Sequence, residues 1–396
     1  MRNVEQPRDK RLPAAATKIG DPDEKGIIKL AARLKKIKCY LGHLSEGVDD
    51  HARQRFLDLM FKKDQWALGP AYCGIHANGL TEADLEILAQ KGAAIVWSPL
   101  SNLLLYGQTT RINKAAKLGI RIALGSDWSP SGSRNLLGEM KIARAQAKIA
   151  GSALKSADIV AMATSNPAQM LGWDHLLGSI APGKYADLVV FKGKGGDAYD
   201  HLIDASETAL LAVVIGGRVR LADPDLALIA AADAETVTID GAKKHIDIHD
   251  PDADQLVEGL SLAGATARLA DGLARIAELH ADLLRRARRG SMALRTSARR
   301  TWFLVLDEDE EGGPQPAHTL AAIKTGGAGA ADGLYPPILR ELVRPRTLAA
   351  RAAAELPLKP LKLDPLTIAD DANYVPALLA QHNLPQSLKD AIDRHF

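Results

Sequence analysis

The spacing of hydrophobic residues alternates between two patterns over residues 26–127. Short apolar runs are typical of buried strands, and the longer segments between them carry apolar residues at helical spacing. The predicted strands are residues 37–41, 71–75, 93–97 and 122–124. The predicted helices are residues 27–36, 48–63 and 134–150, with another that starts at a capping Thr81. Strands that alternate with helices in this way predict βαβ units and a parallel sheet.

A residue suited to chemistry stands at or just after the end of each predicted strand. The four are His43, His76, Ser98 and Asp127. In parallel α/β folds the active site lies at the C-terminal ends of the strands. One such position would mean little, but four in the same place in successive units predict a common site.

The pattern changes after Pro182. Strand-like segments at residues 185–191 and 211–220, with short alternating stretches at 237–239 and 246–248, predict a small β domain. Leucines and an isoleucine recur every seven residues over residues 252–289 and predict one long helix, packed on its own domain or, on weaker grounds, in a coiled coil. A last strand is expected at residues 301–306.

Composition narrows the class of protein. The chain has 396 residues, a formal charge of +2 and two cysteines, so neither a strongly charged partner nor a disulfide framework is expected, and a cytoplasmic location is favoured. No apolar stretch is long enough to span a membrane. Residues 275–300 hold eight arginines, which without interleaved aromatic residues indicate a solvated helix face and not a nucleic-acid site.

His43 and Glu46 have the types and spacing of a metal-assisted hydrolytic site. A histidine at a strand end can bind Zn²⁺, and a glutamate three residues later can reach a metal-bound water and move its proton to a leaving group. His76 can polarise the bond under attack, and Asp127 can bind metal and accept the proton of the water. Taken singly, each residue also has a structural explanation at a strand end or turn, and for a lone histidine that explanation is the more common one.

Several longer motifs resemble the deaminase and chlorohydrolase branch of the metal-dependent amidohydrolase superfamily. They are Trp97-Ser98-Pro99-Leu100-Ser101-Asn102, Leu105-Tyr106-Gly107, Leu124-Gly125-Ser126-Asp127, Asn166-Pro167-Ala168, and Leu177-Gly178-Ser179-Ile180-Ala181-Pro182-Gly183-Lys184 followed by Ala186-Asp187-Leu188-Val189-Val190. The order of these motifs along residues 26–220 is more specific than any one of them.

The resemblance implies an α/β fold that contains strands five to eight of a (β/α)8 barrel. The implied domains are a polar lead-in (1–25), the partial barrel (26–180), a small β-sandwich-like domain (181–250) and a mainly helical C-terminal region (251–396). The implied activity is hydrolysis of a non-peptide carbon–nitrogen bond in a small molecule by metal-activated water.

The resemblance also assigns roles to individual residues. His43 and Asp127 would bind the metal, with zinc expected and iron as the alternative. Glu46 would move the proton and His76 would polarise the substrate, so that Glu46, His76 and Asp127 form the catalytic set. Ser98, Ser101 and Asn102 would border the substrate.

One part of the family pattern is missing from this sequence. The family places a His-x-His pair at the first barrel strand, but His43 is the first histidine of this chain. An incomplete metal site is therefore expected, to be completed by a second copy or by a separate N-terminal half. The alternative is an inactive, truncated remnant or a binding protein that keeps part of the fold.

Overall fold

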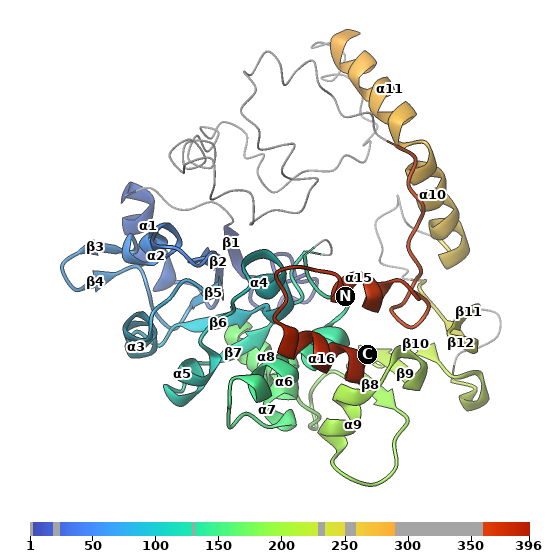
Figure 1. Ribbon diagram of the computed structural model, residues 1–396, viewed down its shortest axis with the longest axis horizontal. Helices are drawn as coiled ribbons and strands as arrows, with labels where there is room; N and C mark the ends of the chain where they lie inside the picture. The colour runs from blue at the N-terminus through green and yellow to red at the C-terminus, as the bar shows by residue number, and fades with distance from the viewer. Residues whose placement is uncertain (1–2, 19–23, 129–130, 229–233, 250–258, 290–358) are drawn as a thin grey trace. The chain divides into compact units, whose positions relative to one another are not determined.

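The computed structural model describes residues 3–18, 24–128, 131–228, 234–249, 259–289 and 359–396 (Figure 1). The chain divides into two compact units. One comprises Met1–Ile229, Val237–His245 and Thr367–Phe396, and the other comprises Ala230–Thr236 and Ile246–Leu366. All of the expected site residues belong to the first unit.

A five-stranded parallel sheet forms the centre of the first unit. Its strands, in spatial order, are β1 (Ala16–Lys18), β2 (Tyr40–Leu44), β5 (Tyr72–His76), β6 (Ala94–Trp97) and β7 (Ile122–Leu124). The predicted α/β fold with a parallel sheet is confirmed. β1 lies in the expected polar lead-in, and β2 starts three residues later than expected and so contains His43.

Helices connect these strands, and the Thr81 cap is confirmed. The helices are α1 (Glu24–Leu34), α2 (Asp50–Leu57), α3 (Glu82–Gln90), α4 (Pro99–Tyr106), α5 (Ile112–Lys117), α6 (Leu136–Ile149), α7 (Ser156–Ala163) and α8 (Ser165–Leu171).

The helix predicted over residues 48–63 is wrong in its second half. The chain leaves α2 at Leu57 and forms a hairpin of β3 (Met60–Lys62) and β4 (Gln65–Trp66), turning at Asp64 with a left-handed φ of 59°. The hairpin brings the Trp66 ring to 5.0 Å from the buried Phe56 ring, whereas Met60 remains 42% exposed. Aromatic packing across the turn thus replaces the expected helical face.

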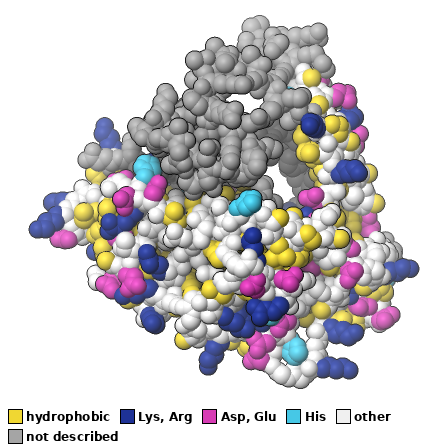
Figure 2. Space-filling model, viewed as in Figure 1, with side chains coloured by type: hydrophobic (Ala, Val, Ile, Leu, Met, Phe, Trp, Pro, Cys, Tyr) yellow, Lys and Arg dark blue, Asp and Glu magenta, His cyan; other side chains and the backbone are white. Residues whose placement is uncertain are grey.

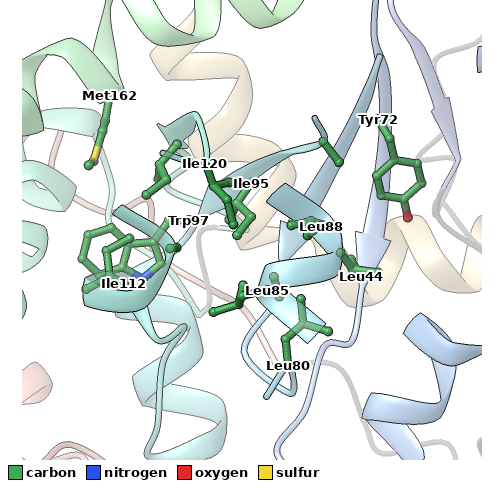
Figure 3. Close-up of a cluster of buried hydrophobic side chains, with 14 of the residues drawn as sticks. Leu44, Tyr72, Leu80, Leu85, Leu88, Ile95, Trp97, Ile112, Ile120 and Met162 are labelled. Carbon is green, nitrogen blue, oxygen red and sulfur yellow. The ribbon is translucent and has the colours of Figure 1, made fainter. Parts of the chain in front are cut away.

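Both faces of the parallel sheet are buried, as is usual for parallel strands. One face packs against the helices through large side chains, among them Ile95 and Trp97 of β6 and Leu85 and Leu88 of α3 (Figure 3). Each such side chain contributes about 1.5–3 kcal/mol when fully buried. The other face carries smaller residues, including Cys39 and Cys73, which are free thiols with sulfur atoms 3.7 Å apart.

The expected β domain is one five-stranded sheet among the described residues. Its order is β11 (Glu235–Ile239), β12 (Ala242–Ile246), β10 (Arg218–Ala222), β9 (Leu210–Ile215) and β8 (Leu188–Phe191). The segment expected as one strand at 211–220 is a hairpin, because Gly216 and Gly217 both adopt positive φ. Nearby are α9 (Ala198–Asp204) and the 3-10 helices Glu207–Ala209 and Pro224–Leu226.

The prediction of one long helix over residues 252–289 is wrong. Ser261 caps α10 (Leu262–Ala274), and Arg275 leaves helical geometry before α11 (Ile276–Arg289). No residue of α10 is buried, so no packing against a neighbouring element favours one unbroken helix. The strand expected at 301–306 and most of the arginine-rich stretch lie outside the described residues.

The end of the chain returns to the first unit. α15 (Tyr374–Leu379) and α16 (Gln386–His395) pack against α4 and α6, and α16 lies beside α6 (Figure 1). Their buried side chains share a second core with Leu100, Leu103 and Ile142. These residues were expected only to be part of a helical extension.

Charged side chains of both signs are interspersed over the face shown in Figure 2, in keeping with the small net charge. Among the described helices, none combines the length and the hydrophobicity that crossing a membrane requires.

Candidate metal and catalytic site

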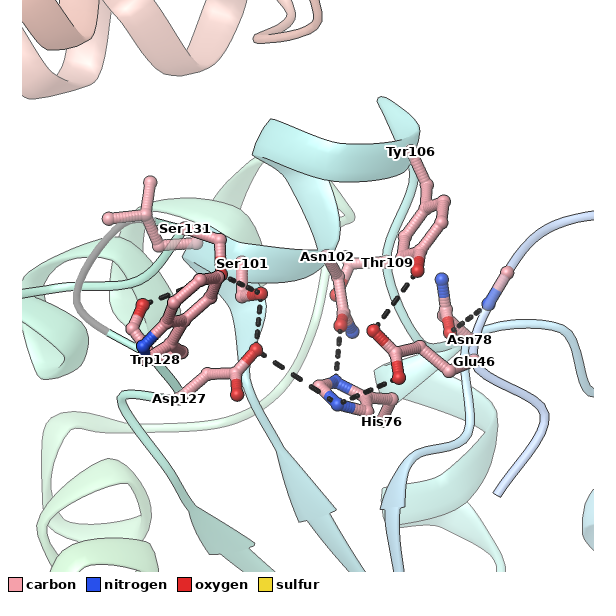
Figure 4. Close-up of polar contacts among 12 residues, drawn as sticks. Glu46, His76, Asn78, Ser101, Asn102, Tyr106, Thr109, Asp127, Trp128 and Ser131 are labelled. Atoms are coloured by element: carbon pink, nitrogen blue, oxygen red, sulfur yellow. Dashed lines mark hydrogen bonds and ion pairs between the residues drawn. The ribbon is translucent and has the colours of Figure 1, made fainter. Parts of the chain in front are cut away.

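The candidate site lies at the C-terminal edge of the parallel sheet. His43 is in β2, Glu46 follows β2, and His76 ends β5. The potential ligand atoms of these three residues all lie within 4.8 Å of one another. His76 Nε2 is 3.6 Å from Glu46 Oε2 and 4.0 Å from Asp127 Oδ2, which follows β7 (Figure 4). The strand-end pattern therefore located side chains that share one site.

The backbone turns sharply where it presents these groups. Ser45, His76 and Asp127 have φ angles of 47°, 71° and 59°, a left-handed region that is unfavourable for residues with a Cβ. Such residues cost of order 1–3 kcal/mol each and persist where the surrounding structure fixes them. Here the loop after β5 holds the loop after β2: Gly79 N–H donates to Ser45 O at 3.0 Å, and Gly47 N–H donates to Asn78 Oδ1 at 3.1 Å.

Helix α4 lies over the site and contacts three of its four polar groups (Figure 4). Its first contact is a 2.5 Å hydrogen bond from Ser101 Oγ to Asp127 Oδ2. The other two contacts are Asn102 Oδ1 to His76 Nδ1 at 3.0 Å, and Tyr106 Oη to Glu46 Oε1 at 3.0 Å. One helix therefore orients both carboxylates and one imidazole.

Buried polar contacts hold α4 at both ends. Ser98 occupies the N-cap position without a side-chain capping bond, and Glu139 of α6 accepts the Leu100 N–H at 2.9 Å instead. Glu139 is 0% exposed, and burial raises its pKa to about 7 despite the donors around it. At the other end, Asn383 Nδ2 donates to Leu104 O at 2.8 Å.

Ser98, Ser101 and Asn102 are all buried. The contacts of Ser101 and Asn102 described above go to Asp127 and His76, and contact of these three residues with a substrate stays a prediction. Residues that the sequence analysis did not single out for the site include Tyr106 and Glu139. Tyr106 stands four residues after Asn102 and so shares its helical face, which is a signal that could have found it.

Trp128 is a second aromatic residue that was not singled out. It follows Asp127 directly and is 70% exposed, an unusual position for an indole. Figure 4 shows its ring on the Asp127 side of the site.

The donor set fits a divalent transition metal. The imidazoles of His43 and His76 and the carboxylate of Glu46 form one group. The second carboxylate, Asp127, lies beside this group, 4.0 Å from His76 Nε2. Zinc is commonly bound by such nitrogen and oxygen ligands, and catalytic zinc sites use three from the protein. The structure thus assembles more donors than the two ligands, His43 and Asp127, that were expected from the sequence.

Comparison with known proteins finds a family match over part of the chain. Residues 61–220, which include His76 and Asp127, match the amidohydrolase family. Over these residues the chain is similar to members of that family. The matched segment contains β5, β6 and β7 of the parallel sheet and continues to β10.

Individual relatives resemble the chain over part of its length. A 5-methylthioadenosine/S-adenosylhomocysteine deaminase of Desulforudis audaxviator is 26% identical over 226 residues, which are 53% of this chain and 49% of the relative. A 5'-deoxyadenosine deaminase of Methanothermobacter thermautotrophicus is 29% identical, covering 41% of this chain and 40% of that protein. The chain spans about half the length, or less, of these curated relatives.

A zinc-bound adenosine deaminase from Xanthomonas campestris is similar in structure. It has a TM-score of 0.46 and 23% identity, over 54% of this chain and 53% of that one.

Proposed function

We propose that this chain is a deaminase-like hydrolase that acts on a non-peptide carbon–nitrogen bond of a small molecule. The observation that carries the proposal is the meeting of His43, Glu46, His76 and Asp127 at one edge of a parallel sheet. The same proposal takes this sheet as part of a (β/α)8 barrel, in which catalytic groups lie at the C-terminal strand ends. The activities named for the relatives support this reaction class.

His43 and Asp127 would hold a divalent metal, for which zinc is the best candidate. When bound, this metal would supply the Lewis acid that makes water nucleophilic near neutral pH. Asp127 is prepared for this role because Ser101 fixes one of its oxygens.

Glu46 is the proposed proton-transfer group. Its side chain is 30% exposed, so one side of the carboxylate can meet a substrate while Tyr106 holds the other. A carboxylate so placed can take a proton from the attacking water and deliver it to the departing amine.

The surroundings of Asp127 support an aromatic substrate. The exposed Trp128 ring offers a flat apolar surface on which an aromatic ring can stack. An aminated heterocycle, such as the base of an adenine nucleoside, matches both this surface and the proposed chemistry.

Ammonia release from the zinc-loaded chain tests the proposal, with adenine nucleosides and aminated pyrimidines as substrates. We expect ammonia from at least one of them, and a loss of about 10²–10⁴ in kcat for Glu46→Gln. Glu86→Gln, an exposed change on α3, is the matched control and should leave kcat unchanged. Absence of ammonia throughout, or full activity of Glu46→Gln, would overturn the proposal.

A further inference from the structure

His76 has two ring nitrogens in different surroundings. Nδ1 faces Asn102 Oδ1 at 3.0 Å, whereas Nε2 faces Glu46 and Asp127. A neutral imidazole carries one proton, and the nitrogen that lacks it offers a lone pair. Whether Nε2 carries the proton or the lone pair decides what His76 can do in the site.

The hydrogen-bond network behind His76 determines how the Asn102 amide is turned. Thr110 Oγ1 donates its single hydrogen to His76 O at 2.6 Å, so toward Asn102 this hydroxyl can only accept. Asn102 Nδ2 lies 3.5 Å from Thr110 Oγ1. The amide nitrogen, which donates, therefore belongs on the Thr110 side.

Thr109 is compatible with this orientation of the amide. The Trp97 indole is a pure donor and donates to Thr109 Oγ1 at 2.8 Å, and Asn102 Nδ2 lies 3.2 Å from the same oxygen. A hydroxyl oxygen has two lone pairs, so it can accept both donors at once. Reversing the amide would leave its oxygen facing a Thr110 hydroxyl with no hydrogen to give.

The orientation of the Asn102 amide determines which nitrogen of His76 carries the proton. With the nitrogen on the threonine side, Asn102 presents its carbonyl oxygen to His76 Nδ1, and only a protonated Nδ1 can donate to it. Asn102 is 0% and His76 1% exposed, so solvent has little access to compete for this bond.

We propose that Asn102 is a positioning residue that holds neutral His76 as the Nδ1–H tautomer, with the Nε2 lone pair directed at Glu46 and Asp127. In this state His76 cannot donate a hydrogen bond from Nε2 to polarise a substrate. Its Nε2 is instead a Lewis base, available to bind the metal or to accept a proton. The assignment of the tautomer rests on the hydrogen bonds behind His76, whereas its use in metal binding rests on the proposed function.

The tautomer can be measured on the metal-free chain by long-range ¹H–¹⁵N NMR of the histidine rings at a fixed pH at which they are neutral. The His76 signals are identified by their loss in His76→Phe. We expect the Nδ1–H form in the wild type and in Asn102→Asp, which keeps an acceptor oxygen at Nδ1. Asn102→Leu should shift His76 toward Nε2–H, and Thr110→Val should give a mixture because the amide is then free to reverse.

Nε2–H in the wild type would overturn the assignment, as would an unchanged tautomer in both Asn102→Leu and Thr110→Val. Zinc affinity gives a second readout that does not depend on turnover. Loss of the outer hydrogen bond of a ligating histidine weakens metal binding about 10–100-fold, so Asn102→Leu should show this loss and Asn102→Asp should not. Equal zinc affinity in all three proteins would contradict the metal-binding use of Nε2. A chain that shows the expected tautomer but no ammonia release would refute only the proposed reaction.

Discussion

At the scale of single residues, the residues at strand ends could be predicted from the sequence, whereas their partners far along the chain could not. His43, His76 and Asp127 were located because each stands at the end of an apolar run, and strand ends in a parallel sheet share an edge. Glu139 was missed because its partner is 39 residues away, and no local pattern encodes such a pairing. Tyr106 was missed although it shares a helical face with Asn102, because its partner Glu46 is 60 residues away.

Tyr106→Phe tests whether the phenol positions Glu46. The change removes one hydrogen bond to a carboxylate and keeps the ring, at a cost of about 1.5 kcal/mol. If this bond acts in the transition state, kcat should fall about tenfold with KM little changed. Tyr199→Phe alters a half-exposed tyrosine on α9 and should leave both constants as they are. An unchanged kcat in Tyr106→Phe would refute the positioning role.

Trp128→Ala tests the stacking surface. Loss of the exposed indole should raise KM for an aminated heterocycle, by about 1 kcal/mol or roughly fivefold, while kcat changes less. Trp128→Phe keeps a flat ring and should remain close to the wild type. Equal KM values for the alanine and phenylalanine variants would show that the ring does not bind the substrate.

At the scale of elements, the alternation of strands and helices was predictable, but the ends of the elements were not. The four predicted strands are present, whereas the helix expected at residues 48–63 stops at Leu57 because the Phe56–Trp66 contact favours a hairpin. Helix α4 is the element on which the site depends most, since it links to three of the four polar groups. Its attachment to α6 through Glu139 could not be derived from periodicity.

Glu139→Gln tests that attachment through the pH dependence of stability. The pKa of Glu139 is raised from 4.5 to about 7 by burial, so the folded chain binds more protons than the unfolded chain between these values. The free energy of unfolding therefore falls as pH rises through this window, by up to about 3 kcal/mol. Glutamine keeps an oxygen for the Leu100 N–H but carries no charge.

Urea unfolding at pH 5, 7 and 8 measures the effect. Relative to the wild type, Glu139→Gln should gain stability as pH rises, with the largest difference at pH 8. Glu82→Gln changes a glutamate that is 64% exposed and should show no such trend. A constant difference across the three pH values would contradict a buried, titrating Glu139.

At the scale of the whole molecule, a segment from the far end of the sequence packs into the core of the first unit. Leu378, Leu384, Leu388 and Ile392 share a core with α4 and α6. Asn383 adds hydrogen bonds to the end of α4. The amphipathic pattern of this segment predicts a helix, but nothing local specifies a contact with residues more than two hundred positions away.

Leu388→Ala tests the contribution of this segment. Leu388 is fully buried, and truncating such a leucine costs about 2–5 kcal/mol. Thermal and urea unfolding should show this loss, whereas Asp393→Ala on the exposed side of α16 should stay within about 0.5 kcal/mol of the wild type. A loss below 1 kcal/mol in Leu388→Ala would mean that the segment does not pack as described.

The central claim is that the edge of the parallel sheet is a metal-dependent hydrolytic site, and a zinc titration of activity tests it most directly. Zinc is added to the metal-free chain while ammonia release from an aminated heterocycle is followed. We expect the rate to rise from background and to saturate with zinc in the wild type, and to stay at background in His43→Ala. A rate that remains at background in the wild type at saturating zinc, or that is equal in His43→Ala, would contradict the claim.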